Sequence, residues 1–271
     1  MKLKTALIQM NSGISIAENM EQATKLIEQA AAQGAQLAIT PENTCHLRSA
    51  PKDKLEAAPL EEAHPMISHF AGLAKKLNIW LIAGSICVRV SDTHMANRCY
   101  AFSNEGKTVG TYDKIHLFDV DLPNGERFRE SDTVAAGNKP VVVQTPWGGI
   151  GLTICYDVRF PKLYRALAKA GADILIVPAA FAALTGRAHW EVLLRARAIE
   201  NGCFVLAAGQ TGVHENGRLT HGHSLVVNPW GQVVADGGED IGIVLHEIDL
   251  TEVQTARHAI PALKHEKEIA F

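Results

Sequence analysis

Short apolar runs alternate with amphipathic segments along most of the chain. Residues 3–10 are predicted to form a short apolar strand, and residues 35–40 are predicted to form the next strand. Between these runs, Ser15 and Glu18 form an S-x-x-E capping box, which predicts a helix that ends near Gly34. An alternation of strands and helices at this spacing is typical of α/β proteins.

Other neighbouring strands are joined by short turns. Residues 100–103 and 108–112 flank an Asn-Glu-Gly turn and predict a hairpin, and residues 141–144 and 150–154 flank Pro-Trp-Gly-Gly in the same way. Because the strands of a hairpin pair antiparallel, we expect mixed sheets. A four-layer αββα sandwich, with two mixed sheets face to face and helices outside, accommodates both features, although the pattern alone does not require it.

The rest of the pattern completes this outline and contains one long loop. The polar stretch 120–139 is expected to be irregular and is long enough to be functional rather than connective. The remaining predicted elements are a helix that starts at 64–65, helices at 162–170 and 188–201, strands at 79–90, 173–177, 203–208 and 242–249, and a hairpin of 223–227 with 232–235.

Composition narrows the classes of function. The chain has 271 residues, of which 47% are hydrophobic and 20% charged, and it contains no repeat or linker, so we expect one domain over residues 1–271. A net charge of −3 argues against a nucleic-acid partner. The first residues resemble neither a signal peptide nor a membrane span. Five scattered cysteines without a C-x-x-C pair indicate free thiols in a reducing compartment, and hence a cytoplasmic protein.

Cys155 stands where a buried strand gives way to a helix. The run 150–154 is apolar, and Pro161 opens the helix predicted at 162–170. A thiol in this position is held rigidly, and the dipole of the helix is expected to favour the thiolate. A buried structural thiol is the alternative, because a free cysteine is mostly protonated at neutral pH and needs a partner to act as a nucleophile.

The sequence around this cysteine, CYDVRFP, resembles the nucleophile segment of the nitrilase, or carbon–nitrogen hydrolase, superfamily. That family uses a glutamate, a lysine and a cysteine in this order, and the segments PEN at Glu42 and YDKIHLFD at Lys114 match the other two. All three residues follow predicted strands, so they can converge at one edge of a sandwich. The resemblance extends over nearly the whole chain and implies the αββα sandwich.

The resemblance also implies a covalent amide hydrolysis. Cys155 would attack the amide carbonyl, while Glu42 takes the thiol proton, delivers it to the leaving nitrogen and then activates water against the thioester. Lys114 and the backbone N–H of Tyr156 would stabilise the oxyanion. Relatives carry a second glutamate at the position of Glu130, which would orient Lys114 or the substrate amide. This chemistry requires no metal and no cofactor.

The resemblance points to a small amide as the substrate partner. Residues 178–200 resemble the branch that includes deaminated glutathione amidase, with ω-amidase, which acts on α-ketoglutaramate, as the alternative; nitriles and N-carbamoyl compounds rank lower. Both favoured substrates carry carboxylates, which a guanidinium binds well. For Arg159, a structural salt bridge to Asp157 is the alternative. The candidate substrate contacts are Arg159, Phe181 and Thr185, while Ala182 and Arg187 depart from the residues usual in relatives.

Three further interpretations concern assembly, metal and class. Helix 188–201 has apolar residues on two sides, which fits burial within one chain or contact with a second subunit, and relatives that pair through outer helices favour a homodimer. His221 and His223 suggest a metal site, but no further ligand stands at a familiar spacing. A non-catalytic scaffold of the same fold would have no reason to keep the complete catalytic set.

Overall fold

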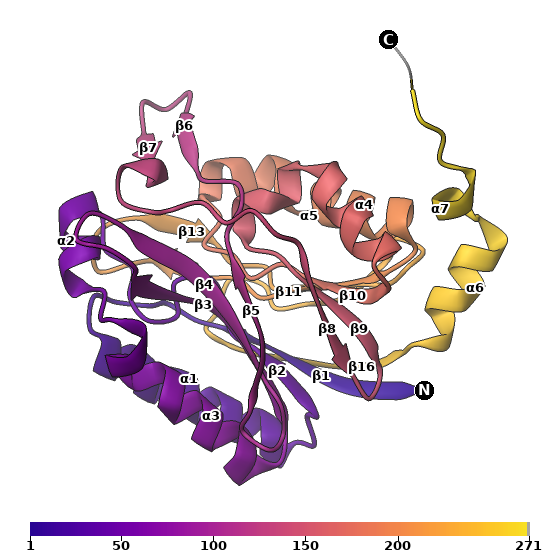
Figure 1. Ribbon diagram of the computed structural model, residues 1–271, viewed down its shortest axis with the longest axis horizontal. Helices are drawn as coiled ribbons and strands as arrows, with labels where there is room; N and C mark the ends of the chain where they lie inside the picture. Colours follow the sequence, from indigo (N-terminus) through magenta and orange to yellow (C-terminus); the bar gives the residue numbers. More distant parts are fainter. Residues whose placement is uncertain (270–271) are drawn as a thin grey trace.

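The computed structural model describes residues 1–269, apart from the side chain of Pro51. Two six-stranded sheets lie face to face, and helices cover the outer face of each (Figure 1). This arrangement confirms the four-layer αββα sandwich with mixed sheets.

The first sheet is parallel in its centre and antiparallel at its edges. Its strands are, in order, β16 (Gly242–Asp249), β1 (Lys2–Gln9), β2 (Leu37–Ile39), β3 (Trp80–Arg89), β4 (Met95–Phe102) and β5 (Thr108–Asp113). β1, β2 and β3 run parallel, whereas β16 pairs antiparallel with β1. β4 and β5 form the predicted antiparallel hairpin.

The second sheet repeats this plan. Its strands are, in order, β15 (Val233–Asp236), β14 (Leu225–Val227), β11 (Phe204–Ala207), β10 (Ala172–Ile176), β9 (Gly148–Leu152) and β8 (Val141–Thr145). β9, β10 and β11 run parallel, and the two predicted hairpins form the edges. The β8–β9 turn is tighter than expected, because β9 already begins at Gly148.

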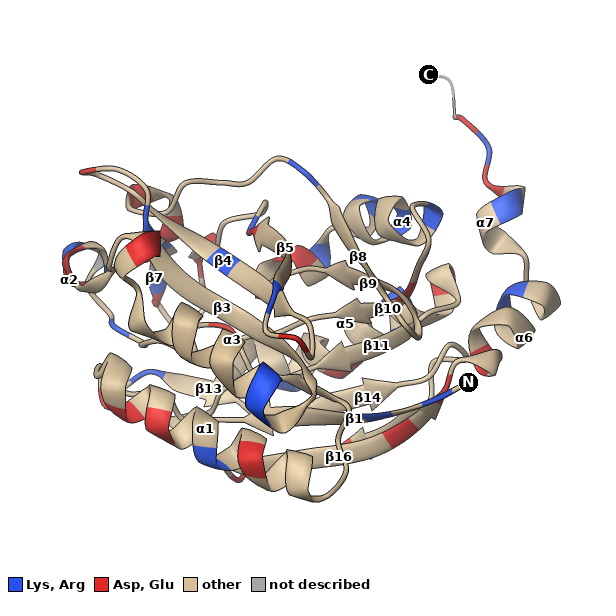
Figure 2. Cartoon of the chain, turned by 60° about the horizontal axis from the view of Figure 1, so that its bottom comes forward, with Lys and Arg blue, Asp and Glu red and all other residues tan. Residues whose placement is uncertain are grey.

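Four helices form the outer layers. Helices α1 (Ile16–Ala32) and α3 (Pro65–Leu77) pack on the first sheet, and α4 (Pro161–Lys169) and α5 (Ala183–Asn201) pack on the second (Figure 1). The capping residue of α1 is the predicted one, since the hydroxyl of Ser15 accepts a hydrogen bond from the N–H of Glu18 at 3.4 Å. Figure 2 shows charged residues along α1 and at the end of α3, on the sides that face solvent.

Shorter helices complete the chain. They are α2 (Pro51–Ala57), α6 (Thr251–Ala259), α7 (Ala262–His265) and the 3-10 turns Glu61–Ala63, Glu130–Asp132 and Cys155–Arg159. Within residues 1–269, every helix, long or short, is too short or too polar to span a bilayer.

Side-chain alternation in β1 separates two layers of apolar core. Leu3 and Leu7 belong to the core between the sheets, together with Ile174 of the second sheet. Ala6 and Ile8 belong to the core beneath α1 and α3. Because both faces of the strand are buried, its residues 6–8 are apolar in succession instead of alternating with polar residues.

The structure corrects two expectations. Residues 120–139 are not wholly irregular, because β6 (Asp119–Asp121) and β7 (Arg127–Arg129) pair as a small hairpin. Helix α5 begins at Ala183 rather than at 188. Its early residue Gly186 obscured that start, yet packing requires a glycine there, because a Cβ atom would collide with the ring of His221.

One strand pair has no counterpart in the sequence prediction. The two-stranded sheet of β12 (Thr211–Val213) and β13 (Leu219–His221) lies outside both large sheets. Each strand has three residues, too few to produce a recognisable alternation.

Candidate active site

The three residues marked by the sequence motifs converge on one cavity. Glu42 follows β2, Lys114 follows β5 and Cys155 follows β9, so both large sheets contribute. All three residues line a cavity of about 260 Å³. They are 3%, 2% and 7% exposed, respectively, so their functional groups are largely withdrawn from bulk water.

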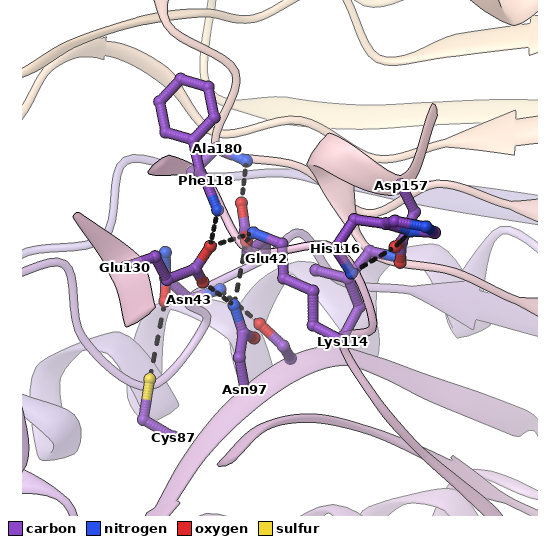
Figure 3. Close-up of polar contacts among 12 residues, drawn as sticks. Glu42, Asn43, Cys87, Asn97, Lys114, His116, Phe118, Glu130, Asp157 and Ala180 are labelled. Carbon is purple, nitrogen blue, oxygen red and sulfur yellow. Dashed lines mark hydrogen bonds and ion pairs between the residues drawn. The ribbon is translucent and has the colours of Figure 1, made fainter. Parts of the chain in front are cut away.

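Lys114 lies between two carboxylates (Figure 3). Its Nζ is 2.8 Å from Oε1 of Glu42 and 2.8 Å from Oε2 of Glu130. Asn97 closes the arrangement, because its Nδ2 donates to Oε1 of Glu42 and to Oε1 of Glu130, both at 3.0 Å. The other oxygen of Glu42 accepts a hydrogen bond from the N–H of Ala180 at 2.9 Å. Three donors thus fix the orientation of the Glu42 carboxylate.

Charge pairing controls the ionisation of this cluster. Burial disfavours the charged form of Glu42, but the charge and hydrogen bond of Lys114 outweigh burial and lower the pKa of Glu42 to about 2. Burial also opposes charge on Lys114, yet the carboxylates of Glu130 and Glu42 hold the pKa of Lys114 well above its usual value. Glu42 is therefore ionised at neutral pH and can act as a base.

This pairing predicts a loss of stability in acid. The pKa of Glu42 is about 2 in the folded protein and 4.5 without its partners, so its contribution is complete above pH 4.5 and disappears as the pH falls towards 2. This difference in the pKa of Glu42 corresponds to about 3 kcal/mol in the free energy of unfolding. We expect Glu42→Gln to flatten the pH dependence of the unfolding free energy over this range, measured by urea denaturation. Equal slopes for the variant and the wild type would contradict the assignment.

Cys155 has a strained backbone. Its φ is 48°, in the left-handed region that residues other than glycine rarely adopt. Its N–H donates to the carbonyl oxygen of Pro178 at 2.9 Å, which holds the turn against the chain leaving β10. Among the described residues, the N–H of Tyr156 has no hydrogen-bond partner, so it is available to a developing oxyanion.

The thiol of Cys155 departs from one sequence expectation. The dipole of the following helix is expected to favour the thiolate, but burial and the charge of Glu42 raise the pKa of Cys155 well above its usual value, against the opposite effect of Lys114. Helix α4 begins only at Pro161, after a short 3-10 turn. The site therefore holds a neutral thiol beside a carboxylate, and sulfur becomes nucleophilic only as Glu42 takes its proton.

Asp157 and Asn97 are structural members of the site that sequence reasoning missed. Asp157 is fully buried and accepts hydrogen bonds from the hydroxyl of Tyr112 at 2.7 Å and from the N–H of Ile154 at 2.8 Å. Its other oxygen accepts the N–H of His116 at 3.1 Å (Figure 3). Asp157 thereby ties the Cys155 turn to the segment that follows Lys114. The only sequence signal for Asp157 is its place in the segment CYDVRFP, and the sequence contains no signal for Asn97.

The proposed substrate contacts do not all reach the cavity. Phe181 and Thr185 line it, with Thr185 in the first turn of α5 rather than in a loop. Arg159 lies outside the cavity lining. Its guanidinium carbon is 5.3 Å from the centre of the Phe181 ring, and its Nη1 is 3.3 Å from Nδ1 of His189. Within the described chain, Arg159 forms no ion pair with Asp157. Of the two departures from relatives, Ala182 lines the cavity and Arg187 does not.

Other cations line the cavity instead. Arg218 is held by a hydrogen bond from Nη2 to the carbonyl oxygen of Ala180 at 2.6 Å, and its guanidinium carbon lies 5.2 Å from the centre of the Phe128 ring. Its Nε is buried and has no hydrogen-bond partner within the part of the chain that the structure describes. The cationic residues of the lining, besides Lys114, are Lys54, Arg127, Arg129 and Arg218. They favour an anionic ligand.

Sequence relatives support the resemblance noted above. Residues 4–258 match the carbon-nitrogen hydrolase family. The chain is 41% identical over 264 residues to a Synechocystis protein named deaminated glutathione amidase, and the match covers 96% of each chain. It is 40% identical over 268 residues to a Homo sapiens protein of the same name, covering 97% of this chain and 81% of the human one.

Solved structures share the fold. The Caenorhabditis elegans NitFhit protein superposes with a TM-score of 0.91 at 38% identity, covering 98% of this chain and 65% of that longer chain. Saccharomyces cerevisiae Nit3, described as a member of branch 10 of the nitrilase superfamily, superposes with a TM-score of 0.86 at 30% identity, covering 96% of this chain and 94% of that one. This chain therefore belongs to the carbon–nitrogen hydrolase family of the nitrilase superfamily.

Proposed function

We propose that this protein hydrolyses an amide bond of a small carboxylic acid through a thioester on Cys155. The observation that carries the proposal is the convergence of Glu42, Lys114 and Cys155 on one buried cavity, where the carboxyl is ionised and the thiol is protonated. The family membership and the amidase names of relatives support the same class of reaction.

The mechanism follows from these protonation states. As the sulfur of Cys155 bonds to the carbonyl carbon, its proton moves to Glu42. The oxyanion accepts hydrogen bonds from Lys114 and from the N–H of Tyr156. The C–N bond then breaks, and Glu42 returns the proton to the leaving nitrogen. Glu42 next takes a proton from water, which attacks the thioester; as the C–S bond breaks, Glu42 returns this proton to the sulfur and the acid is released. Glu130 positions Lys114 throughout.

The substrate favoured by this proposal is deaminated glutathione, cleaved to α-ketoglutarate and cysteinylglycine. The names of the Synechocystis and Homo sapiens relatives support this choice. The substrate carries two carboxylates, one at each end, and the cavity lining has four cationic residues besides Lys114, of which Arg127 and Arg129 also pair with Asp121. α-Ketoglutaramate carries only one carboxylate and would engage fewer of them.

Release of α-ketoglutarate tests this function, because both candidate substrates yield that acid. We expect kcat/KM for deaminated glutathione to exceed that for α-ketoglutaramate by more than about 10-fold, the scale of one lost polar contact. Equal values would overturn the substrate assignment and leave the amidase chemistry in place. Failure of the wild type to hydrolyse either compound would overturn the amidase proposal itself.

Arg218, rather than Arg159, is proposed to bind a substrate carboxylate. A charge-assisted hydrogen bond contributes about 1.5–3 kcal/mol, so Arg218→Met should lower kcat/KM by roughly 10- to 100-fold. Arg218→Lys should restore only part of this loss, because lysine cannot grip both oxygens. Arg159→Met is the matched control and should stay within a few-fold of the wild type. A large loss in the Arg159 variant alone would reverse the assignment.

We also propose a homodimer that forms through the outer face of α5. Val192 and Ile199, seven residues apart on this helix, are 65% and 52% exposed, and nearby Trp230 is 56% exposed. Such an apolar face is costly in water and fits a subunit contact. We expect a dimer in sedimentation-velocity experiments and a monomer for Val192→Asp. Val213→Asp, at a comparably exposed residue of β12, is the control and should remain dimeric; a monomeric wild type would contradict the proposal.

The remaining proposals concern domain organisation and location. We propose one catalytic domain over residues 1–271, which the family match over residues 4–258 supports. We propose a cytoplasmic location, supported by five cysteines that are all free, as a reducing compartment would keep them.

A further inference from the structure

A second cluster of reactive side chains lies beside the catalytic cavity. Sγ of Cys45, Sγ of Cys87 and a ring nitrogen of His46 lie within 4.8 Å of one another. The three residues are only 0%, 3% and 1% exposed. Cys45 and His46 follow closely after Glu42 in the chain, and Cys87 lies in β3. No step of the proposed hydrolysis uses any of them.

His46 lacks hydrogen-bond partners in this surrounding. Both of its ring nitrogens are buried, and neither has a partner among the described residues. A neutral imidazole has one donor and one acceptor, and each buried group left unpaired costs about 1–3 kcal/mol. A cation bound at the acceptor nitrogen would remove one of these costs. The orphaned imidazole is thus an observation, independent of the thiols, that points to a missing ligand.

A backbone contact holds the two thiols together. The N–H of Cys87 donates to Sγ of Cys45 at 3.1 Å, which keeps this sulfur beside β3. Metals bind cysteine as the thiolate, so a cation held by both sulfurs would displace their thiol protons.

A nearby histidine, His64, is not counted as a ligand. Its Nδ1 accepts a hydrogen bond from the N–H of Met66 at 3.2 Å, so Nε2 carries the ring proton. A protonated nitrogen cannot coordinate a metal, and among the described residues this one has no hydrogen-bond partner. The cluster therefore offers three protein ligands and leaves a fourth coordination position open.

We propose that Cys45, His46 and Cys87 form a binding site for Zn²⁺ or a similar thiophilic cation. Two thiolates and one imidazole are a ligand set that Zn²⁺ prefers. Tetrahedral zinc, with Zn–S bonds of about 2.3 Å and Zn–N bonds of about 2.0–2.1 Å, places its ligand atoms about 3.5–3.8 Å apart, a small contraction of the cluster. Binding forms two Zn–S bonds and one Zn–N bond, releases thiol protons to solvent and changes no oxidation state.

The cluster has an entry route. Cys87 lines the catalytic cavity, so an ion in the cavity can reach its sulfur. Figure 3 shows this sulfur directed at Asn43, with Sγ 3.5 Å from Oδ1. The site departs from the sequence expectation of no metal. Cys45 and Cys87 lie 42 residues apart and match no familiar ligand spacing, so only the pairing of β2 with β3 brings them together.

The experiment uses the full-length Cys155→Ala protein, reduced and freed of metal, so that the catalytic thiol cannot contribute. Titration with Cd²⁺ should give the ultraviolet charge-transfer band of cadmium thiolate and saturate at one ion per chain, and Zn²⁺ should displace it. Cys45→Ser or Cys87→Ser, added to this background, should weaken binding by more than about 100-fold, and His46→Ala should weaken it by at least about 10-fold. Cys203→Ser, at a buried thiol outside the cluster, is the matched control and should leave binding unchanged.

X-ray absorption at the zinc edge identifies the ligands of zinc bound to the Cys155→Ala protein. This measurement tests the proposal even if a variant of Cys45, His46 or Cys87 fails to fold. We expect two sulfur ligands and one imidazole nitrogen. Three results would each overturn the proposal: binding by the wild type but not by Cys155→Ala, a cadmium band that persists without Cys45 or Cys87, and a zinc ion without sulfur ligands. The amidase assays above use no added metal, so they succeed or fail independently.

Discussion

Replacing Cys155 with alanine should lower kcat by about 10⁵- to 10⁶-fold, the scale on which loss of a covalent nucleophile acts in an enzyme of this kind. The proposed reaction has no other nucleophile. The methyl side chain of alanine cannot form a thioester, even with the carboxylate of Glu42 beside it. Because Cys155 is buried and its backbone is already fixed by the carbonyl of Pro178, the folded state should persist. Amide hydrolysis and circular dichroism measure the two effects.

Cys203→Ala provides the matched control for this prediction. Cys203 is also free and fully buried, but it lies outside the cavity lining. We expect the control to keep turnover within a few-fold of the wild type. Intact-mass analysis during turnover should also reveal an acyl adduct on Cys155 in the wild type. Substantial turnover by Cys155→Ala would exclude the thioester mechanism.

Replacing Lys114 with methionine should damage both stability and catalysis. The substitution leaves the buried carboxylate of Glu42 and the partly buried carboxylate of Glu130 without their shared cation, and breaking a buried pair in this way costs about 3–5 kcal/mol. Loss of one oxyanion donor lowers kcat by a further factor of about 10² to 10³. Urea denaturation and steady-state kinetics measure the two losses separately.

A double variant separates these two roles of Lys114. Lys114→Met with Glu130→Gln removes one of the stranded carboxylates and should recover part of the lost stability without recovering activity. Lys107→Met, which removes a lysine paired with Glu105 at the surface, is the control and should change stability by less than about 1 kcal/mol. Near-normal kcat in Lys114→Met would show that this cation has no part in the reaction.

Local sequence was sufficient for most of the fold because each signal is local in origin. Strands buried on both faces carry near-continuous apolar runs, and β3 is visible in the sequence as such a run. The capping side chain of Ser15 lies three residues from the N–H that it binds, and α1 was placed from that pair. The sequence predicts the start of α5 five residues too late, at 188 instead of Ala183, because Gly186 is a poor helix former. Packing against His221 requires this glycine.

For the site too, local sequence identifies some residues and misses others. Glu42, Lys114 and Cys155 were identified because each sits in a short motif after a strand, and strand ends of a sandwich can meet at one edge. The sequence suggests Arg159 because it lies four residues after Cys155, and it gives no sign of Arg218. Only the folded chain places Arg218 in the cavity lining and Arg159 against Phe181 and His189.

For this protein, local sequence patterns are enough to find the main strands and helices of the two large sheets, the hydrolase superfamily and the three residues expected to react. The groups that surround these three residues become known only from the folded chain. Asn97 bridges two carboxylates, Asp157 ties the nucleophile turn to Tyr112 and His116, and the N–H of Cys87 meets the sulfur of Cys45. The physical reason is that these contacts join residues dozens of positions apart, so they depend on strand pairing and sheet packing, which no local pattern encodes.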